Sequence, residues 1–258
     1  MSLIEVLCLA AVAALAGAVN AIAGGGTLLT FPALLFFHTA PIVANATSTV
    51  ALVLGTAGSI FGFRQHLHAI WPWLLRFALV SLAGGLLGSF LLTRTDPQTF
   101  VKLVPFLILF ATVLFLAQGA FRRFAGFGEN GGEIQVHHRR VGVAVLFQFA
   151  VSVYGGYFGA GIGILMLASL GFLGLRDIHQ MNALKNALGS LINLVAAAWF
   201  TASGLIDWPK AGVMTVGALA GYFVGAHFSQ RIPQAATRRL ITGIGFTISA
   251  VMFYRQFR

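Results

Sequence analysis

Acidic residues are scarce in this sequence, whose 258 residues include 6 Asp and Glu against 16 Lys and Arg. Charged residues of both signs make up only 9% of the chain, whereas 58% of its residues are hydrophobic and the mean hydropathy is +0.89. A soluble globular domain carries far more charge and less apolar sequence than this. The composition therefore excludes an ordinary soluble domain. It predicts a polytopic membrane protein, with the lipid bilayer as a partner.

The positive charge is not gathered in one place. The net charge is +10 and the isoelectric point is near 11.1, values that nucleic-acid-binding proteins also reach. The basic residues of this chain, however, are distributed between apolar runs rather than gathered in one patch. We therefore expect no nucleic acid partner. We interpret these residues as loop charges that orient a membrane protein.

Cysteine is nearly absent as well. The single cysteine, Cys8, excludes an intramolecular disulfide and a cysteine-based metal cluster, and its apolar surroundings predict packing as a small hydrophobe. His137 and His138 are adjacent, so they point in different directions on a helix, and no carboxylate or cysteine ligand accompanies them. A solvated basic loop explains them better than a metal site. No metal and no cofactor is expected.

Two glycine-rich segments, Gly24–Gly26 and the run with Gly159, Gly161 and Gly163, interrupt the apolar sequence and are spaced as copies. Gly24 and Gly161 are 137 residues apart. The same offset, with no gap, pairs Gly26 with Gly163, Asn45 with Asn182, Trp71 with Trp208, Pro72 with Pro209, Gly84 with Gly221 and Gly88 with Gly225. Chance does not easily supply the asparagine pair and the Trp-Pro pair in one register. We therefore infer an internal duplication.

Each copy predicts one glycine-interrupted element and three full spans. In the first copy the interrupted element consists of Leu3–Ile22 and Thr27–Phe37, and the spans are Ala44–Phe63, Trp71–Leu92 and Phe100–Gln118. In the second copy the interrupted element consists of Val141–Phe158 and a short piece to Leu175, and the spans are Ala183–Ser203, Pro209–Ser229 and Leu240–Tyr254. A bilayer core of about 30 Å needs about 20 helical residues, so the short pieces either turn back or complete a broken helix. The predicted fold is an all-α polytopic membrane protein with two homologous repeats, residues 1–120 and 141–258, and a polar linker, residues 121–140.

The distribution of Lys and Arg favours interrupted elements that return to their own side. If both elements re-enter, eleven cations share one side and five lie opposite; if both cross, the split is nine against seven. The eleven are Arg64, Arg76, Arg122, Arg123, Arg139, Arg140, Arg176, Lys185, Arg231, Arg238 and Arg239, and the five are Arg94, Lys102, Lys210, Arg255 and Arg258. The positive-inside rule therefore favours re-entrant elements and an inverted repeat.

No carboxylate falls inside a predicted span, but one cation does. All 6 acidic residues lie at span ends or in loops, whereas Lys185 stands inside an apolar run. A cation at a helix centre costs at least about 2.5 kcal/mol in lipid, which points to a functional role. Residues three or four apart share a helix face, so Asn182, Lys185, Asn186 and Ser190 can form one polar stripe. The alternative is that Lys185 lies near the span end and extends to the headgroups.

The glycine breaks and the polar residues after them together predict a site for a small anion. Each break exposes N–H groups at the start of a half-helix, where the partial charge is positive. The candidate substrate-binding residues are Asn20, Gly24, Gly25, Gly26, Thr27, Asn45, Thr47, Ser48, Thr49, Gly159, Gly161, Gly163, Asn182, Lys185 and Asn186. For the Asn, Ser and Thr residues the alternative role is hydrogen bonding between helices, and for the glycines it is close helix packing. Packing is also the role expected of two glycine ladders, Gly84 with Gly88 and Gly217 with Gly221 and Gly225.

These motifs resemble one known family. The segments GGGTLLTFPALL with NATST, and GAGIGILMLASL with NALKN, are similar to those of the TauE/SafE sulfite exporter family, also called the toluene sulfonate uptake permeases. The resemblance covers nearly the whole chain outside the linker. It implies secondary transport of sulfite, thiosulfate or sulfonates across a bacterial inner membrane. It also implies substrate-site roles for the glycines of both breaks and the Asn, Ser and Thr residues after them. The second break departs from the first at Ile162 and Ser169, which stand where the first copy has Gly25 and Pro32.

The favoured function is therefore a secondary anion transporter with its site near the midplane between the repeats. The sequence is compatible with proton coupling and does not require it. A passive anion channel is the nearest alternative, and it predicts flux that ignores a pH gradient and saturates poorly. An intramembrane enzyme would need Ser48 and Lys185 as nucleophile and base, and no flanking nucleophile motif supports it. We expect no enzymatic activity. A homo-oligomer is compatible with the sequence.

Overall fold

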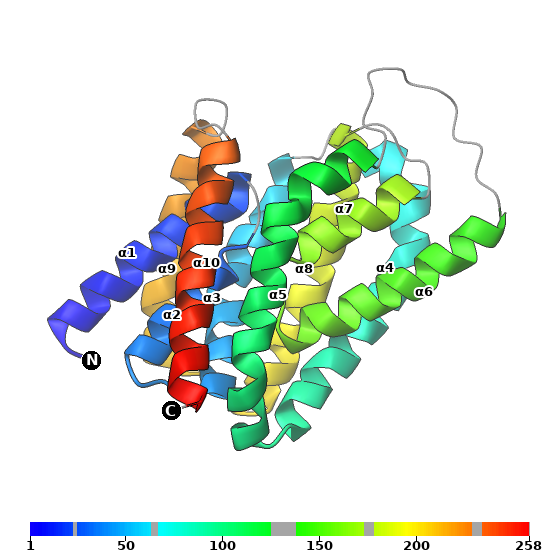
Figure 1. The fold of residues 1–258 in the computed structure, drawn as a ribbon. Helices are drawn as coiled ribbons and strands as arrows, with labels where there is room; N and C mark the ends of the chain where they lie inside the picture. The colour runs from blue at the N-terminus through cyan, green and yellow to red at the C-terminus, as the bar shows by residue number, and fades with distance from the viewer. Residues whose placement is uncertain (23–24, 63–66, 125–137, 173–177, 229–233, 258) are drawn as a thin grey trace.

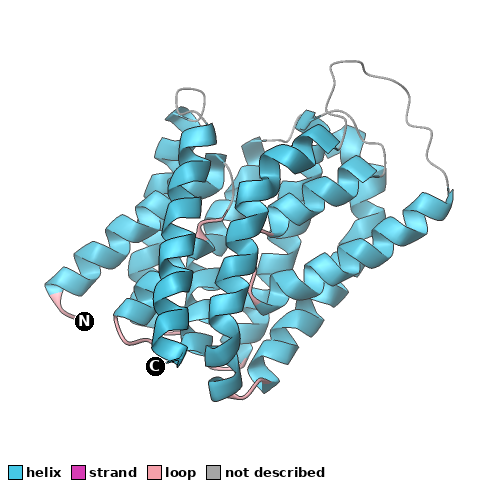
Figure 2. Cartoon of the chain, viewed as in Figure 1, coloured by secondary structure: helices cyan, strands magenta, loops and turns pink. Residues whose placement is uncertain are grey.

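The computed structural model describes residues 1–22, 25–62, 67–124, 138–172, 178–228 and 234–257, and within these ranges all regular secondary structure is helical (Figure 2). The helices are α1 (Leu3–Ile22), α2 (Thr27–Phe36), α3 (Pro41–Gly62), α4 (Leu67–Arg94), α5 (Pro97–Phe124), α6 (His138–Tyr157), α7 (Ile162–Phe172), α8 (Ile178–Ala202), α9 (Trp208–Phe228) and α10 (Gln234–Phe257). The all-α prediction is confirmed for this part of the chain. The middle of the predicted linker, including His137, lies outside the described residues.

Local sequence signals set several helix ends. Asp96 accepts a hydrogen bond from the Thr99 N–H (3.0 Å), and Pro97 follows it as the first residue of α5. Asp207 caps α9 in the same way through the Lys210 N–H (3.3 Å). At the end of α8, Gly204 takes a positive φ of 69°, a conformation that glycine adopts without strain. Capping and turn residues thus separate the long helices.

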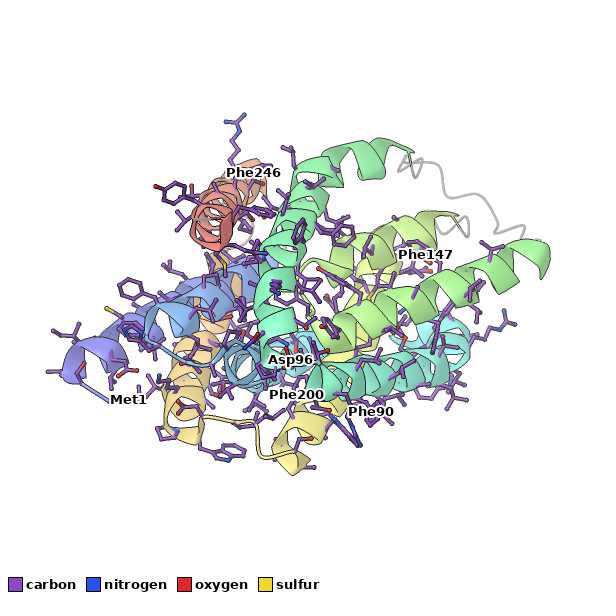
Figure 3. All side chains as sticks on the ribbon, turned by 60° about the horizontal axis from the view of Figure 1, so that its bottom comes forward. Met1, Phe90, Asp96, Phe147, Phe200 and Phe246 are labelled. Atoms are coloured by element: carbon purple, nitrogen blue, oxygen red, sulfur yellow. The ribbon has the colours of Figure 1, made fainter. Side chains whose placement is uncertain are left out.

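Four helical segments of the described chain are long and apolar enough to cross a membrane. They are Leu3–Ala21, Ile70–Arg94, Pro97–Ala117 and Gln180–Ala202, and shorter apolar helices lie at Thr27–Phe36, Pro41–Thr56, Gly142–Tyr157 and Ile241–Tyr254. Large apolar side chains cover the outside of the bundle, among them the exposed Phe90, Phe147 and Phe246 of α4, α6 and α10, which are labelled in Figure 3. Such a surface suits contact with lipid rather than water.

Cys8 belongs to this outer surface, so its predicted packing role is wrong. The face of α1 that packs inward carries Leu9, Ala13 and Ala16, all fully buried and spaced one helical turn apart. Cys8 lies off this stripe and is exposed.

Each glycine-interrupted element returns to the end of the molecule from which it starts, and the two elements start from opposite ends (Figure 1). The N-terminus, the α2–α3 connection, the α4–α5 connection and the C-terminus lie at the lower end of that view, which we call the termini end. The α5 C-terminus and the α6 N-terminus lie at the opposite end, which we call the linker end. Lys210, near the start of α9, contacts both Glu5 at the start of α1 and Thr39 just after α2. The α1–α2 pair therefore starts and finishes at the termini end.

Glycines allow two helix pairs to pack backbone against backbone. A Cβ atom at Gly217, Gly221 or Gly225 of α9 would collide with the backbone of Ala10, Ala14 or Ala18 of α1. On the other side of the bundle, a Cβ atom at Gly84 or Gly88 of α4 would collide with the backbone of α6. Both ladders therefore lie at close helix contacts, as expected. Between these two pairs, α3 packs against α8 in the middle of the bundle.

Candidate functional site

Both glycine breaks line a single cavity of about 90 Å³, although they lie far apart in the sequence. Its lining residues are Asn20, Gly25, Thr27, Thr49, Leu52, Thr56, Phe158, Gly159, Gly161, Ile162, Gly163, Met166, Lys185, Asn186, Gly189, Ser190, Asn193 and Tyr222. They come from the α1–α2 and α6–α7 breaks and from α3, α8 and α9. Nine of the fifteen candidate residues are among them. Gly24 lies outside the described residues.

The first break depends on glycine for two separate reasons. Gly25 has a φ of 96°, a left-handed conformation that favours glycine, and the ring of Phe115 lies where its Cβ atom would be. A Cβ atom at Gly26 would lie only 2.8 Å from the carbonyl oxygen of Ala16. The chain can therefore turn between α1 and α2 only because these positions lack side chains.

Asn20 supports the first break. Asn20 lies two residues before the end of α1, and its side-chain Oδ1 accepts a hydrogen bond from the Gly26 N–H at 2.8 Å. Gly26 is the N-cap residue of α2, where N–H groups lack partners within the helix. The Asn20 amide oxygen thus occupies a position at the start of α2 that an anion would otherwise take.

The second break is made by Gly159 and Gly161, whose φ angles are 81° and 79°. Gly163 was also predicted to interrupt the helix, and this is wrong, because α7 begins at Ile162 and Gly163 lies in its first turn. Gly163 has a different role. A Cβ atom there would lie 3.2 Å from Cδ of Lys185, so the glycine leaves room for the lysine stem.

The polar stripe of α8 enters the cavity at a different register from the predicted one. Lys185, Asn186, Ser190 and Asn193 line the cavity, whereas Asn182 is half-buried outside it. Asn186, Ser190 and Asn193 follow one another at spacings of four and three residues and share one face of α8, and Lys185 stands next to Asn186. Lys185 lies over the start of α7 and against the cavity rather than among the outward-facing side chains. This position disfavours the interpretation that it extends to the headgroups.

Three of the candidate residues make hydrogen bonds between elements outside the cavity. The Asn45 side-chain amide donates to the Tyr157 carbonyl oxygen at the end of α6 (3.1 Å). Thr47 Oγ1 accepts from the Asp207 N–H (3.1 Å), and Ser48 Oγ bonds Thr30 Oγ1 (2.6 Å). All three α3 side chains are buried. They have the interhelical role that we gave as the alternative, while Thr49 is the residue of this segment that reaches the cavity.

Sequence reasoning missed two kinds of lining residue. Asn193 lies one turn beyond Ser190, so the α8 spacing could have found it. Tyr222 of α9 gave no signal, because the duplication pairs it with Gly85, which has no side chain. Its ring packs against α3 at Gly55, where a Cβ atom would lie 2.7 Å from Cδ2 of Tyr222. Only the folded arrangement brings this aromatic ring to the cavity.

The charge of the cavity lining is one-sided. Lys185 is its ionisable cation, and the other polar lining groups are neutral amides, hydroxyls and backbone. The acidic residues that the structure describes, Glu5, Asp96 and Asp207, all lie at the termini end and none lines the cavity. One cation with neutral donors is an arrangement that favours a small anion over a cation.

Comparisons with known proteins agree with this picture. The sequence pattern of the family described as sulfite exporter TauE/SafE matches residues 9–252. A probable membrane transporter protein of Haemophilus influenzae is 29% identical over 243 residues, which cover 92% of this chain and 90% of that protein. The probable membrane transporter protein YfcA of Escherichia coli K12 is 27% identical, covering 93% of this chain and 85% of that protein. The probable membrane transporter protein YunE of Bacillus subtilis is 24% identical, with 84% and 86% covered. No solved structure matches the chain. This chain, a multi-pass helical membrane protein, therefore belongs to the sulfite exporter TauE/SafE family of membrane transporter proteins.

Proposed function

We propose that this protein is a secondary transporter of small sulfur oxyanions across the bacterial inner membrane and that the anion binds in the cavity between the two breaks. The observation that carries the proposal is the cavity itself, because glycine breaks from both halves of the chain meet there and, among the described residues, its lining holds one lysine and no carboxylate. The description of the matching family as a sulfite exporter supports the choice of sulfur anion.

The helix N-termini at the two breaks differ in how well they can bind an anion. At the start of α2, the Gly26 N–H already donates to Asn20. The offset pairs Asn20 with Tyr157, whose hydroxyl bonds Thr95 Oγ1 (3.2 Å) and cannot cap α7 in the same way. The start of α7 also lies beside Lys185. We therefore place the anion at the α7 N-terminus, where the helix dipole and the ammonium group act together.

The size of the cavity favours the smallest of the expected substrates. One water molecule needs roughly 10–15 Å³ of such space, so a cavity of about 90 Å³ holds several waters. Sulfite or thiosulfate, each with one or two sulfur atoms and a few oxygens, fits such a space. The ring of an arylsulfonate needs a larger one. The proposed substrate is therefore an inorganic sulfur oxyanion.

The packing of the helices supports a twofold relation between two repeats, residues 1–120 and 141–258, around this site, and the opposite ends at which α1 and α6 begin support their inversion. Under the offset of 137, α1 to α5 correspond to α6 to α10. The offset converts the α1–α9 contact into an α6–α4 contact, and it converts the α3–α9 contact into an α8–α4 contact; all four are present. The α3–α8 and α5–α10 contacts each join a helix to its own copy. Inverted repeats that rock about a central site are a common basis of alternating access.

The proposal is tested by purifying the protein and measuring its binding of sulfite, thiosulfate, an arylsulfonate, sulfate and chloride. Lys185→Met keeps an unbranched stem and removes the charge, so we expect thiosulfate affinity to fall at least tenfold, or about 1.4 kcal/mol. Lys185→Arg should stay within a few-fold of the parent. Lys102→Met, which removes an exposed cation from α5, is the matched control.

Flux in proteoliposomes completes this test. Uptake that saturates and responds to an imposed pH gradient supports coupled transport, whereas poorly saturating flux that ignores the gradient indicates a channel. Parental affinity and rate in Lys185→Met would contradict the proposed anion site.

A further inference from the structure

The side chain of Lys210, near the start of α9, connects three separate parts of the chain at the termini end. Its Nζ lies 3.1 Å from Glu5 Oε1 on α1 and 3.7 Å from Asp207 Oδ2. It also donates to the Phe37 carbonyl oxygen (3.1 Å) and to Thr39 Oγ1 (2.9 Å), just after α2. We call these residues the Lys210 cluster.

This cluster is more than a surface ion pair. The side chains of Lys210 and Glu5 are only 12% and 15% exposed, so their interaction is shielded from solvent. Two of the three acidic residues that the structure describes contact this one lysine. In a chain with so few carboxylates, that concentration indicates a specific role for the contact.

The cluster joins both outer ends of the element that carries the first break. Glu5 stands at the start of α1, and Phe37 and Thr39 follow the end of α2, while the tip between them reaches the cavity at Gly25. Lys210 therefore ties the α1–α2 pair to α9. Asp207 adds α3 to the same assembly, because its N–H donates to Thr47 Oγ1 (3.1 Å).

The Thr39 side of the cluster lies about half a bilayer away from the cavity. Thr39 belongs to the cluster, Thr49 lines the cavity ten positions later, and α3 covers most of the distance between them. At 1.5 Å per residue this separation is about 15 Å, half of a hydrocarbon core of about 30 Å. The cavity is thus near mid-membrane. The cluster extends from the membrane surface of the termini end inward to Asp207, whose N–H bonds Thr47, two residues before Thr49.

We propose that the Lys210 cluster is the closed gate on the termini side of the cavity, and that opening to this side requires Lys210 to separate from Glu5 and the α2–α3 connection. The inference rests on the proposed function, because a transporter must close one side of its site while the other is open. A gate made of polar contacts at the surface can separate into water, which solvates both partners, whereas the close glycine contacts of α1 with α9 hold those two helices together inside the membrane.

The gate is tested by the accessibility of a cavity residue from the termini side. In a Cys8→Ser background, Thr49→Cys supplies a single thiol in the cavity, and vesicles captured through a C-terminal tag expose the termini end uniformly. The probe is a membrane-impermeant methanethiosulfonate reagent added outside. We expect Lys210→Gln to raise the labelling rate at least fivefold, and Glu5→Gln to raise it by a smaller factor, since the Phe37 and Thr39 contacts persist.

Lys102→Gln removes a cation from the same end without touching the cluster, and it should label at the parental rate. Thermal melting and thiosulfate binding of Lys210→Gln, measured without the Thr49 change, establish that this variant is folded. Labelling of a folded Lys210→Gln protein at the parental rate would overturn the gate. If Lys210→Gln fails to fold, Glu5→Gln decides by the same criterion. A parent that binds no sulfur anion but shows the expected labelling would refute the proposed substrate and leave the gate standing.

Discussion

Asn20 shows how one side chain can serve both the fold and the site. Its amide oxygen accepts a hydrogen bond from the N–H of Gly26, the N-cap residue of α2, and the same residue lines the cavity. An amide performs this task without adding charge. A carboxylate at this position would cap the N–H at least as well, because anions favour helix N-termini, but it would place a negative charge beside the proposed anion.

Two substitutions at Asn20 should therefore separate stability from affinity. In Asn20→Asp we expect an unchanged or higher melting temperature and a loss of thiosulfate affinity of at least tenfold, about 1.4 kcal/mol, from like-charge repulsion. In Asn20→Ala we expect a loss of about 1 kcal/mol of stability with affinity kept within a few-fold, because the cap is lost but the cavity charge is not. Thermal melting and equilibrium binding check both. Tight thiosulfate binding by Asn20→Asp would mean that the anion lies elsewhere.

At the scale of the helix, α9 packs closely against α1 because its contact face carries glycines, which have no side chains. Gly217, Gly221 and Gly225 lie on one face, four residues apart, and each contacts the α1 backbone. Gly212 lies on the same helix, is exposed, and has no heavy atom within 4 Å of the position of its missing Cβ. One helix thus offers glycines that are required by packing and one that is not.

We expect Gly221→Val to separate α1 from α9 and to remove most of the folded protein, because the added side chain meets backbone that cannot move aside. Gly212→Ala should leave folding intact and raise stability by about 0.5–1 kcal/mol, the usual gain from alanine in a helix. The yield of monodisperse protein and its melting temperature distinguish the two. Equal yields of Gly221→Val and the parent would show that the ladder does not hold these helices.

Elements were easier to predict than the contacts of their polar residues. The short helix after the first break was predicted as Thr27–Phe37 and ends at Phe36, because glycine and apolar length are local signals. The register of the second break was wrong at Gly163, since sequence cannot tell a glycine with positive φ from one that makes room for a neighbouring lysine.

The α3 segment shows a further limit of sequence pattern. Asn45, Thr47, Ser48 and Thr49 form one polar run, but the first three find partners on Tyr157, Asp207 and Thr30. Polar groups in a bundle that lies in lipid gain from any partner, near or distant. Which of these side chains can reach a ligand depends on the positions of other helices, and the sequence of this segment carries no information about those positions.

At the scale of the whole molecule, charge is divided between the two ends. The linker end carries Arg122, Arg123, Arg139, Arg140, Arg238 and Arg239 near the ends of α5, α6 and α10. The termini end carries fewer cations, and one of them, Lys210, is paired with Glu5 and Asp207. Because cytoplasmic loops are enriched in Lys and Arg, the linker end is expected to face the cytoplasm.

The sides on which the linker and the termini lie distinguish re-entrant from crossing elements. If the α1–α2 and α6–α7 pairs re-enter, each half crosses the membrane an odd number of times, so the linker and the two termini lie on opposite sides. If the pairs cross, the linker and the termini share a side. We expect green fluorescent protein fused after residue 130 to fluoresce, because it folds in the cytoplasm, and alkaline phosphatase fused after Arg258 to be active outside it. Fluorescence from fusions at both positions would contradict the inverted repeat and, with it, the placement of the Lys210 cluster on the outer face.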